Sequence, residues 1–214
     1  MVSARDLKLL YRADRINDNT GIYGIVGNPV MHSLSPQIHN PGFHRINYNA
    51  VYVPFLSDSI RSFLTLPEML RLRGFSVTVP FKVDVVRFLG NITREVKQIG
   101  SCNTVVRVPN MWKGTNTDFY GFLNPIEKEI EDGRITSALV LGAGGAAKAI
   151  VWALKMRSVK VTILNRTVSK AEDMAKLYGV AYDSMDNIKN YEGKVDLVVR
   201  SEERRVGKEC LKRC

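Results

Sequence analysis

Apolar and polar positions follow two alternating patterns along this chain, and together these predict successive strands and helices. Short apolar runs rich in β-branched residues are typical of buried strands, and the segments between them have the wider apolar spacing of helices. The first series reads "IYGIVG", "SPQIHNPGFHRI", "AVYVPF", "FSVTVP", "REVKQIG" and "CNTVVRV". This alternation favours βαβ units and a mostly parallel sheet.

A second series of the same kind begins further along the chain. It reads "SALVLGAGG", the helical "AAKAIVWALKM", "KVTILNRT", the helical "SKAEDMAKLYG" and "VDLVV", so it offers three strands. A polar, helix-prone stretch with Gly133 as a turn residue separates the two series. We therefore predict an α/β protein with five segments: a leader at 1–20, a first domain at 21–123, a linker helix at 124–136, a second, partial domain at 137–200 and a charged tail at 201–214 outside the fold.

Charge changes the picture of what this protein binds. The chain has 214 residues, of which 45% are hydrophobic, and a net charge of +10, so its field attracts anions. The basic residues are scattered and match no nucleic-acid motif, which favours small carboxylates or phosphates over nucleic acid as ligands. No apolar run reaches the roughly 20 residues that span a bilayer. Because charges occupy the beginning of the chain where a signal peptide is apolar, we predict a cytoplasmic protein.

Neither the cysteines nor the histidines have the spacing of a metal site or a disulfide framework. We expect free thiols and no bound metal from these residues: Cys102, Cys210, Cys214, His32, His39 and His44.

The stretch "LVLGAGGAAKAI" carries glycines in the spacing that binds a dinucleotide. Gly142 and Gly144 follow a strand, and Ala147 lies in the helix that comes next. The first glycine makes a tight turn, the second lets a pyrophosphate approach the backbone, and the small third residue lets helix and strand pack closely. A glycine-rich turn that binds nothing is the alternative. On the first interpretation, the backbone from Gly142 through Ala143, Gly144, Gly145 and Ala146 contacts the cofactor, and the second domain is a partial Rossmann domain.

The end of the next predicted strand decides between the two nicotinamide cofactors. An NAD site places a carboxylate there, to bind the ribose hydroxyls. This chain instead has Asn165, Arg166 and Thr167, with Lys170 one turn later. These groups attract a 2′-phosphate, which a carboxylate would repel, so the predicted cofactor is NADP. Basic residues on a surface loop are the alternative.

A lysine follows the strand "FSVTVP", whose Pro80 cannot donate to a ladder hydrogen bond and so marks the strand end. Ligands gather at the carboxyl ends of strands in open α/β sheets, which favours a functional Lys82. An ordinary lysine in the first turn of a helix is an equally good interpretation of the residues alone.

With these motifs in order, the chain resembles the shikimate dehydrogenase family over roughly residues 20 to 200. "YGIVGNPVMHSLSPQIHN" resembles the opening strand, turn and helix of that family, and "SVTVPFK" resembles its lysine motif. "IGSCNTVVR" and "GTNTDFYG" resemble its asparagine and aspartate motifs, and "LGAGGAAKA" and "NRTVSKAEDMA" its cofactor motifs. The resemblance implies an NADP-dependent enzyme that interconverts 3-dehydroshikimate and shikimate, with residues 21–123 as the substrate-binding catalytic domain.

The resemblance also implies roles for individual residues. Ser33 and Ser35 match the serine pair that binds the substrate carboxylate, although Ser35 before Pro36 is also a good helix N-cap. Thr78 matches a substrate contact, and Asn103 and Asp118 match residues that hold the ring hydroxyls. Lys82 and Asp118 match the catalytic pair; a cap on the helix "FYGFL" is the alternative for Asp118.

The expected chemistry needs such a pair. Hydride reduction of a ring ketone builds negative charge on oxygen, which an ammonium group stabilises and protonates while a carboxylate orients it. We expect Lys82 and Asp118 to meet in one cleft facing the nicotinamide.

Three departures from the family pattern keep other hypotheses open. Position 76 is serine where many members have asparagine. The loop and later helices expected after "VDLVV" are replaced by "SEERRVGKECLKRC", so the chain looks C-terminally truncated. The leader resembles the junction in fusions with a dehydroquinate dehydratase. A catalytically inactive binding fragment and a quinate-oxidising relative are therefore the alternatives, and nothing in the sequence indicates an oligomeric state.

Overall fold

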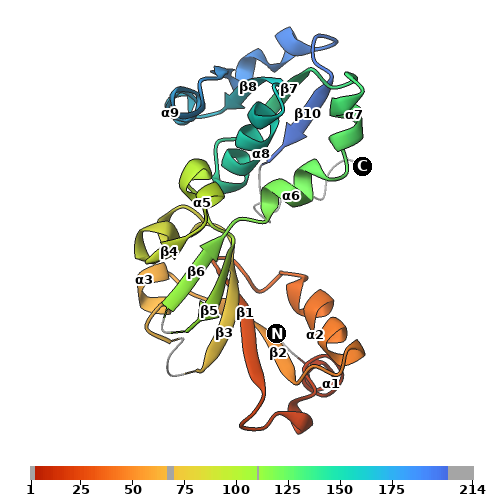
Figure 1. Ribbon diagram of the computed structural model, residues 1–214, viewed down its shortest axis with the longest axis vertical. Coiled ribbons are helices and arrows are strands. Elements are labelled where there is room, and N and C mark those ends of the chain that lie inside the picture. Colours follow the sequence, from red (N-terminus) through yellow and green to blue (C-terminus); the bar gives the residue numbers. More distant parts are fainter. Residues whose placement is uncertain (1–2, 67–69, 110, 202–214) are drawn as a thin grey trace. The chain divides into compact units, whose positions relative to one another are not determined.

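The structure is a computed structural model that describes residues 3–66, 70–109 and 111–201. Its internal contacts divide the chain into two units, Met1–Thr117 and Asp118–Cys214. Both units are α/β layers, as the alternating pattern predicts (Figure 1). No helix in the described part of the chain is long and apolar enough to cross a membrane.

The first unit is built on a six-stranded mixed sheet with the order β2-β1-β3-β5-β6-β4. β1 pairs in parallel with β2 and β3, and β5 runs antiparallel to both β3 and β6. β6 therefore points the same way as β1 and β3. The elements are α1 (Ala4–Leu9), the 3₁₀ helix η1 (Ala13–Arg15), β1 (Gly21–Gly27), α2 (Ser35–Arg45), β2 (Ala50–Leu56), α3 (Ile60–Phe63), β3 (Leu72–Val77), the 3₁₀ helix η2 (Asp84–Phe88), β4 (Asn91–Ile92), α5 (Arg94–Ile99), β5 (Thr104–Val108) and β6 (Met111–Thr115).

Strand order in the first unit reverses between β1 and β3. The chain passes from β1 through α2 to β2 on one side, and then returns to place β3 on the other side of β1. In open α/β sheets such a reversal separates the loops at the carboxyl ends of the two strands, and ligands bind there. Here those strand ends are Gly27 and Val77.

The two faces of the first sheet bury different side chains, because successive residues of a strand point to opposite faces. Val26 packs with Phe75 and Val77 in the larger core, which also contains apolar residues of α3, η2 and α5. Ile25 packs on the other face with Tyr52 and Val30, against Phe43 of α2. α2 therefore covers the face that carries Ile25.

Residues 3–20, which the sequence analysis treats as a leader, form ordered structure against the first sheet. Ser3 caps α1, accepting a hydrogen bond from the Asp6 amide, although α1 itself buries no side chain. Thr20 Oγ1 donates to Asn49 Oδ1 at 2.9 Å, and Asn49 Nδ2 donates to Asn17 Oδ1 at 3.3 Å. These bonds tie the segment to the start of β2.

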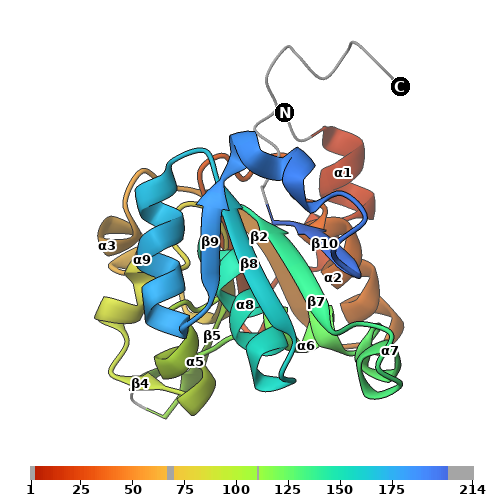
Figure 2. The ribbon, with the colours of Figure 1, turned by 90° about the horizontal axis from the view of Figure 1, so that it is seen from above.

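The second unit contains a four-stranded parallel sheet with the order β10-β7-β8-β9 (Figure 2). The sequence pattern predicts three of these strands and misses β9, whose side chains at the sheet edge are exposed or half-buried and so show no apolar alternation. The elements are α6 (Asp118–Leu123), α7 (Glu127–Glu131), β7 (Ser137–Leu141), α8 (Gly145–Met156), β8 (Lys160–Asn165), α9 (Val168–Tyr178), β9 (Ala181–Ser184), the 3₁₀ helix η3 (Met185–Tyr191) and β10 (Leu197–Arg200).

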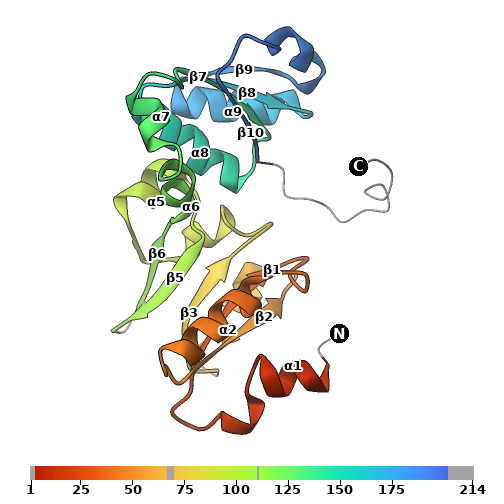
Figure 3. The same cartoon turned by 90° about the vertical axis from the view of Figure 1, so that its right-hand side faces the viewer.

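α8 and α9 lie on the same face of the second sheet (Figure 3). Leu154 of α8 and Met174 of α9 pack with Val140 and Ile163 of the central strands in one core. α6 joins this layer, because the Phe119 ring meets the Trp152 ring of α8 at 5.0 Å, nearly at right angles. The chain therefore divides at the start of α6, whereas the sequence analysis places the boundary after residue 123.

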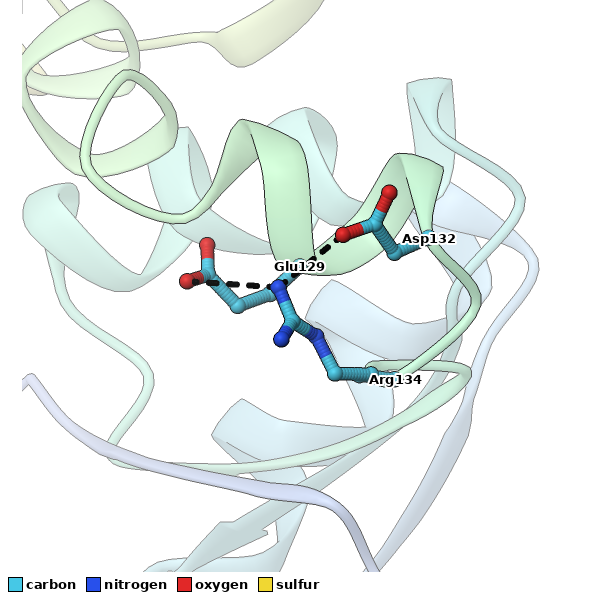
Figure 4. Close-up of polar contacts among 3 residues, drawn as sticks. All are labelled: Glu129, Asp132 and Arg134. Atoms are coloured by element: carbon cyan, nitrogen blue, oxygen red, sulfur yellow. Dashed lines mark hydrogen bonds and ion pairs between the residues drawn. The ribbon is translucent and has the colours of Figure 1, made fainter.

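A tight turn connects α7 to β7. Gly133 has a φ of +72°, a conformation that glycine adopts without strain. The Arg134 and Ile135 amides both donate to the Glu129 carbonyl, at 2.9 and 3.1 Å. The Arg134 side chain lies 3.0 Å from Asp132 and 3.8 Å from Glu129 (Figure 4). Because these ion pairs are exposed to solvent, the backbone bonds hold the turn.

Asp196 joins the start of β10 to the start of β7. Its Oδ2 atom accepts hydrogen bonds at 2.9 Å from the amide and hydroxyl of Thr136 and from those of Ser137. These donors, the Thr136 amide first, lower the pKa of Asp196 to about 2. The carboxylate form thus stabilises the second sheet at neutral pH.

Replacing Asp196 with asparagine should lower the melting temperature at pH 7. Because the folded-state pKa is depressed, this stabilisation is fully present above the unfolded-state pKa of about 4 and is lost as pH falls towards 2. Thermal melts at pH 7, 5 and 3 should therefore show a difference from the parent chain that shrinks with acid. Asp132→Asn, which removes only an exposed ion pair, is the control. A difference independent of pH would contradict this prediction.

Candidate active site

The loops after β1 and β3 meet at one edge of the first sheet. The Thr78 amide donates to the Val26 carbonyl, and the Asn28 amide donates to the Val79 carbonyl, both at 2.9 Å. Gly27 makes this approach possible, because a Cβ atom there would lie 2.3 Å from Thr78 Cγ2 and 2.9 Å from the Val79 carbonyl oxygen. The two segments with the predicted substrate contacts are therefore in direct contact.

Ser33 and Ser35 lie together where the β1 loop enters α2. Ser33 Oγ donates to Ser35 Oγ at 3.0 Å and accepts from the Ser35 amide at 3.2 Å. Leu34 is the N-cap residue, with no side-chain hydrogen bond, and Ser35 is already helical. The interpretation of Ser35 as the helix N-cap is therefore wrong, because the helix begins one residue earlier than the position of Pro36 suggests.

Lys82 lies at the same edge, in the turn that follows Pro80. It is half-buried, and its carbonyl accepts from the Cys102 amide at 2.8 Å. η2 begins only at Asp84, so Lys82 is not in the first turn of a helix. The alternative interpretation of Lys82 as an ordinary first-turn residue is therefore wrong.

Asn103 links the β3 loop to the end of β6. Its carbonyl accepts from the Val77 amide at 2.7 Å, and its side-chain Oδ1 accepts from the Thr117 amide at 2.9 Å. Its Nδ2 donates to Thr117 Oγ1 at 3.0 Å. Asn103 therefore shares the edge that carries Thr78 and Lys82.

Cys102, next to Asn103, is a fully buried thiol. Its sulfur donates towards the carbonyls of Thr104 and Thr115, at 3.3 and 3.2 Å. Together with the hydrogen bond from the Cys102 amide to the Lys82 carbonyl, these contacts fix the segment that precedes β5 against the loop that carries Lys82.

Tyr52 and Ser76 also lie at this edge, and the sequence pattern does not mark Tyr52 as a site residue. Tyr52 of β2 is buried, and its hydroxyl reaches across β1 to donate to Ser76 Oγ at 2.8 Å. Burial raises the pKa of Tyr52, partly offset by hydrogen bonds with Ser76 and Ser35. The His39 ring stacks on the Tyr52 ring at 4.3 Å, which fixes its position. The tyrosine hydroxyl is therefore bonded to Ser76 and lies near the Ser33–Ser35 pair.

Asp118 is the first residue of α6 and belongs to the second unit, whereas Lys82 belongs to the first. Asp118 is half-buried in the first helical turn, where the amides favour negative charge. The structure thus places Ser33, Ser35, Thr78, Lys82 and Asn103 at one sheet edge and describes Asp118 within its own unit.

The glycine turn of the second unit has the geometry that its spacing predicts. Gly142 has a φ of +113°, and its amide donates to the Leu164 carbonyl of β8 at 2.7 Å. Gly144 immediately precedes α8, so the first amides of that helix are presented at the turn. Ala147 is completely buried between helix and sheet, which explains the need for a small residue.

This turn lies where the strand order of the second sheet reverses. The chain places β8 and β9 on one side of β7 and then returns to place β10 on the other. Ser201, directly after β10, donates from its amide and its hydroxyl to the Leu141 carbonyl, at 3.0 and 2.9 Å. The carboxyl ends of β7 and β10 are therefore joined at the point where open α/β sheets bind nucleotides.

The end of β8 presents the predicted polar and basic groups. Asn165 Nδ2 donates to the Thr167 carbonyl at 2.8 Å, and the Lys170 amide donates to the same carbonyl at 3.1 Å. Arg166 is exposed in this short loop. Lys148, which the sequence analysis does not single out, is half-buried in the first turn of α8, and this burial lowers its pKa. Its signal in the sequence is its place four residues after Gly144.

In the described part of the chain, no group of three or more histidine, cysteine, aspartate or glutamate side chains could hold a metal ion. The predicted site residues at both edges carry hydroxyl, amide, ammonium and guanidinium groups, which suit organic anions; the Asp58 carboxylate at the first edge accepts from Asn28 Nδ2 at 2.7 Å.

Comparison with known proteins identifies relatives for both units. The family description "Shikimate dehydrogenase substrate binding domain" matches residues 25–105, and "Shikimate / quinate 5-dehydrogenase" matches residues 126–213. The NADP(+) shikimate dehydrogenase of Caldanaerobacter subterraneus is 42% identical over 169 residues, covering 76% of this chain and 59% of the relative. The enzyme of the same name from Pyrococcus furiosus is 38% identical, covering 87% of this chain and 68% of the relative.

A solved structure gives the same result. The crystal structure of shikimate dehydrogenase from Aquifex aeolicus is 34% identical, with a TM-score of 0.82, over 91% of this chain and 73% of that one. This chain therefore spans about three fifths to three quarters of the length of these relatives. The matches follow both units and preserve their order, and on this evidence the chain belongs to the shikimate dehydrogenase family.

Proposed function

We propose that this protein is an NADP-dependent oxidoreductase that interconverts 3-dehydroshikimate and shikimate, a step of aromatic amino-acid biosynthesis, in the cytoplasm. The observation that carries the proposal is the direct contact between the β1 and β3 loops, which brings Ser33, Thr78 and Lys82 to one sheet edge. The names of the relatives, which are NADP(+) shikimate dehydrogenases, support the choice of substrate and cofactor.

The substrate carboxylate would bind at the hydroxyl network of Ser33, Ser35, Tyr52 and Ser76. Each hydroxyl has one hydrogen to donate, and the bonds Ser33 to Ser35 and Tyr52 to Ser76 fix where the oxygens lie. Asn103 and Thr78 would contact the ring hydroxyls. Residues 21–123 would then act as the substrate domain and residues 137–200 as the nucleotide domain.

NADPH, when bound, supplies the hydride that reduces the ring carbonyl carbon. Lys82 would donate a proton to the carbonyl oxygen as negative charge develops there, so the product is a neutral alcohol. In the oxidising direction the same nitrogen takes the proton back. Asp118 would orient the ammonium group and help to hold the adjacent ring hydroxyl.

The second unit would bind the nucleotide by its phosphates. Backbone amides from Gly142 to Ala146 would contact the pyrophosphate, because they open α8 and point away from its hydrogen-bond ladder. The 2′-phosphate would lie at the end of β8, near Asn165, Arg166, Thr167 and Lys170, where no carboxylate occupies the position typical of NAD sites.

Replacing Tyr52 with phenylalanine should raise KM for shikimate about tenfold while kcat changes little. The ring, its stacking on His39 and the backbone bonds of Tyr52 to Asn40 all remain, so only the hydroxyl is lost. Loss of one hydrogen bond that organises an anion site costs roughly a factor of ten. Steady-state kinetics of Tyr52→Phe measures this change in KM, and Tyr182→Phe, at an exposed tyrosine of β9, is the control. An unchanged KM would contradict a role for Tyr52 at this site.

The proposed function is tested by assaying the 214-residue chain for shikimate-dependent reduction of NADP+. We expect turnover with NADP+ to exceed turnover with NAD+, and shikimate to be preferred over quinate. Calorimetry with NADPH and with shikimate separates binding from catalysis. Binding of both without turnover would identify a catalytically inactive binding protein, and a clear preference for quinate would overturn the proposed substrate.

A further inference from the structure

A hollow of about 180 Å³ lies at the end of the first sheet opposite to the Ser33 and Lys82 loops. It is bounded by η1, the C-terminal end of α2 and the segment that leads into β2. Its polar lining includes Arg12, Arg15, His44, Asn47, Tyr48 and Asn49. We refer to it as the arginine pocket. None of these residues belongs to the proposed active site.

The described residues that line the arginine pocket include cationic groups and no carboxylate. Arg12 is half-buried and has a φ of +47°, a strained conformation for a residue other than glycine. Among the residues that the structure describes, neither Arg12 nor Arg15 forms an ion pair through its side chain. Burial, and then the nearby Arg12 and Arg15, lower the pKa of His44. Like charges held together in this way repel, and a bound anion would relieve that repulsion.

Neutral donors complete the lining of the arginine pocket. The Tyr48 hydroxyl lies 2.9 Å from the Tyr23 hydroxyl, and hydrogen bonds with Tyr23 and then Arg73 lower the pKa of Tyr48. The Arg73 guanidinium group therefore lies near the Tyr48 hydroxyl. Asn47 has a φ of +52°, which asparagine tolerates better than most residues, and it lies on the same rim. Guanidinium, imidazole and amide donors around one hollow match the several oxygens of a phosphate group.

We propose that the arginine pocket is a binding site for a small phosphate-bearing anion, with Arg12 and Arg15 as its main ligands and the His44 ring beside them. The hollow is larger than one water molecule or a chloride ion needs and too small for a dinucleotide. The pocket lies at the amino ends of β1 and β2, which have seven residues each, so roughly 20 Å of strand separates it from the Ser33 and Lys82 loops. It is therefore a second site, distinct from the one where the substrate would bind.

The C-terminal end of α2 faces this pocket, and a helix C-terminus by itself disfavours an anion by a small amount. The last carbonyls of α2 are already occupied: the Gly42 carbonyl accepts from the Ile46 amide and the Phe43 carbonyl from the Tyr48 amide. Two guanidinium groups at direct contact outweigh the partial charge of a helix end, which is about half an elementary charge.

The test is an NMR titration of the 214-residue chain with inorganic phosphate at constant pH and ionic strength, observing the His44 ring. A local signal is needed because phosphate would also bind at the proposed nucleotide site on the glycine turn, and that binding alone would raise the melting temperature. The His44 resonance is assigned as the one absent from His44→Gln. We expect it to move with a millimolar dissociation constant while the His39 ring, stacked on Tyr52, does not move.

Arg12→Gln and Arg15→Gln should each weaken this phosphate binding about tenfold, as expected for loss of a charged hydrogen bond. Arg15 lies on an exposed three-residue helix, so its variant tests the proposal without threatening the fold. Arg61→Gln, an exposed arginine on α3, is the matched control and should leave binding unchanged.

Several results would overturn the proposal. If Arg12→Gln and Arg15→Gln bound phosphate as tightly as the parent chain, neither arginine would be a ligand. If chloride moved the His44 resonance as far as phosphate does, the shift would report ionic strength and not phosphate binding. If succinate bound more tightly than phosphate, the ligand would be a dicarboxylate rather than a phosphate.

Discussion

Replacing Lys82 with alanine is expected to lower kcat about a thousandfold while the dissociation constant for shikimate changes little. The expectation follows from two distinct tasks of one group. The ammonium stabilises the charge that develops on the carbonyl oxygen, and it delivers the proton that completes the alcohol. Both tasks belong to the transition state, so their loss lowers kcat rather than affinity. The loop itself stays in place, because the Lys82 carbonyl still accepts from the Cys102 amide.

Single-turnover kinetics and calorimetry on the same preparation measure these two quantities separately. Lys97→Ala, an exposed lysine on α5, controls for the loss of one positive charge. If Lys82 and Asp118 act as a unit, Lys82→Ala with Asp118→Asn should cost no more than Lys82→Ala alone. Retained turnover in Lys82→Ala would refute the proposed role of the lysine, and fully additive losses would separate Asp118 from it.

Replacing Gly27 with alanine is expected to lower both stability and kcat/KM more than the addition of a methyl group elsewhere at this edge. The added Cβ would lie 2.3 Å from Thr78 Cγ2, on a stiff β-branched side chain, and 2.9 Å from the Val79 carbonyl oxygen. Since neither neighbour can rotate away, the β3 loop must shift. We expect the free energy of unfolding to fall by about 1–3 kcal/mol, as overpacking typically costs, and kcat/KM to fall tenfold or more.

Gly42→Ala is the matched control for this substitution. Gly42 lies inside α2, and a Cβ atom there would meet nothing within 4 Å. This change should raise stability by about 0.5–1 kcal/mol, because glycine weakens helix interiors. Denaturant unfolding and steady-state kinetics on both variants give the comparison. A Gly27→Ala protein with the parent's stability and kcat/KM would show that the β1 and β3 loops tolerate separation.

The central strands could be predicted from sequence because burial on both faces demands continuous apolar runs. β1 and β7 show this pattern most clearly, and the loops that follow them carry the serine pair and the glycine turn. The gathering of polar residues at the strand ends was therefore predictable together with the strands, since a parallel sheet collects these ends at one edge.

Two strands that the pattern missed, β6 and β9, are polar or lie at a sheet edge. β6 pairs with β5 through "MWKGT", and β9 lies at the sheet edge with two exposed residues. Neither shows a regular apolar alternation, because neither has a face that is fully buried.

The division of the chain before α6 depends on the contact of Phe119 with Trp152, which lie far apart in sequence. Local pattern carries no information about such a pair.

The hydroxyl network at the candidate site was missed for the same reason. Tyr52 and Ser76 lie 24 residues apart and meet only because both strands flank β1. Asn103 could be singled out by resemblance to a family motif, but its bonds to Thr117, 14 residues away, required the fold. Pairings across a sheet follow from register, which the sequence leaves open.

The buried thiol of Cys102 offers a measure of how often this edge opens. Its sulfur is shielded from solvent, and its own amide is bonded to the Lys82 carbonyl. A thiol reagent can reach the sulfur only in the moments when this segment separates from its neighbours. The rate of labelling at Cys102 therefore measures how often the loop that carries Lys82 opens. Any molecule that holds this loop closed will slow the labelling.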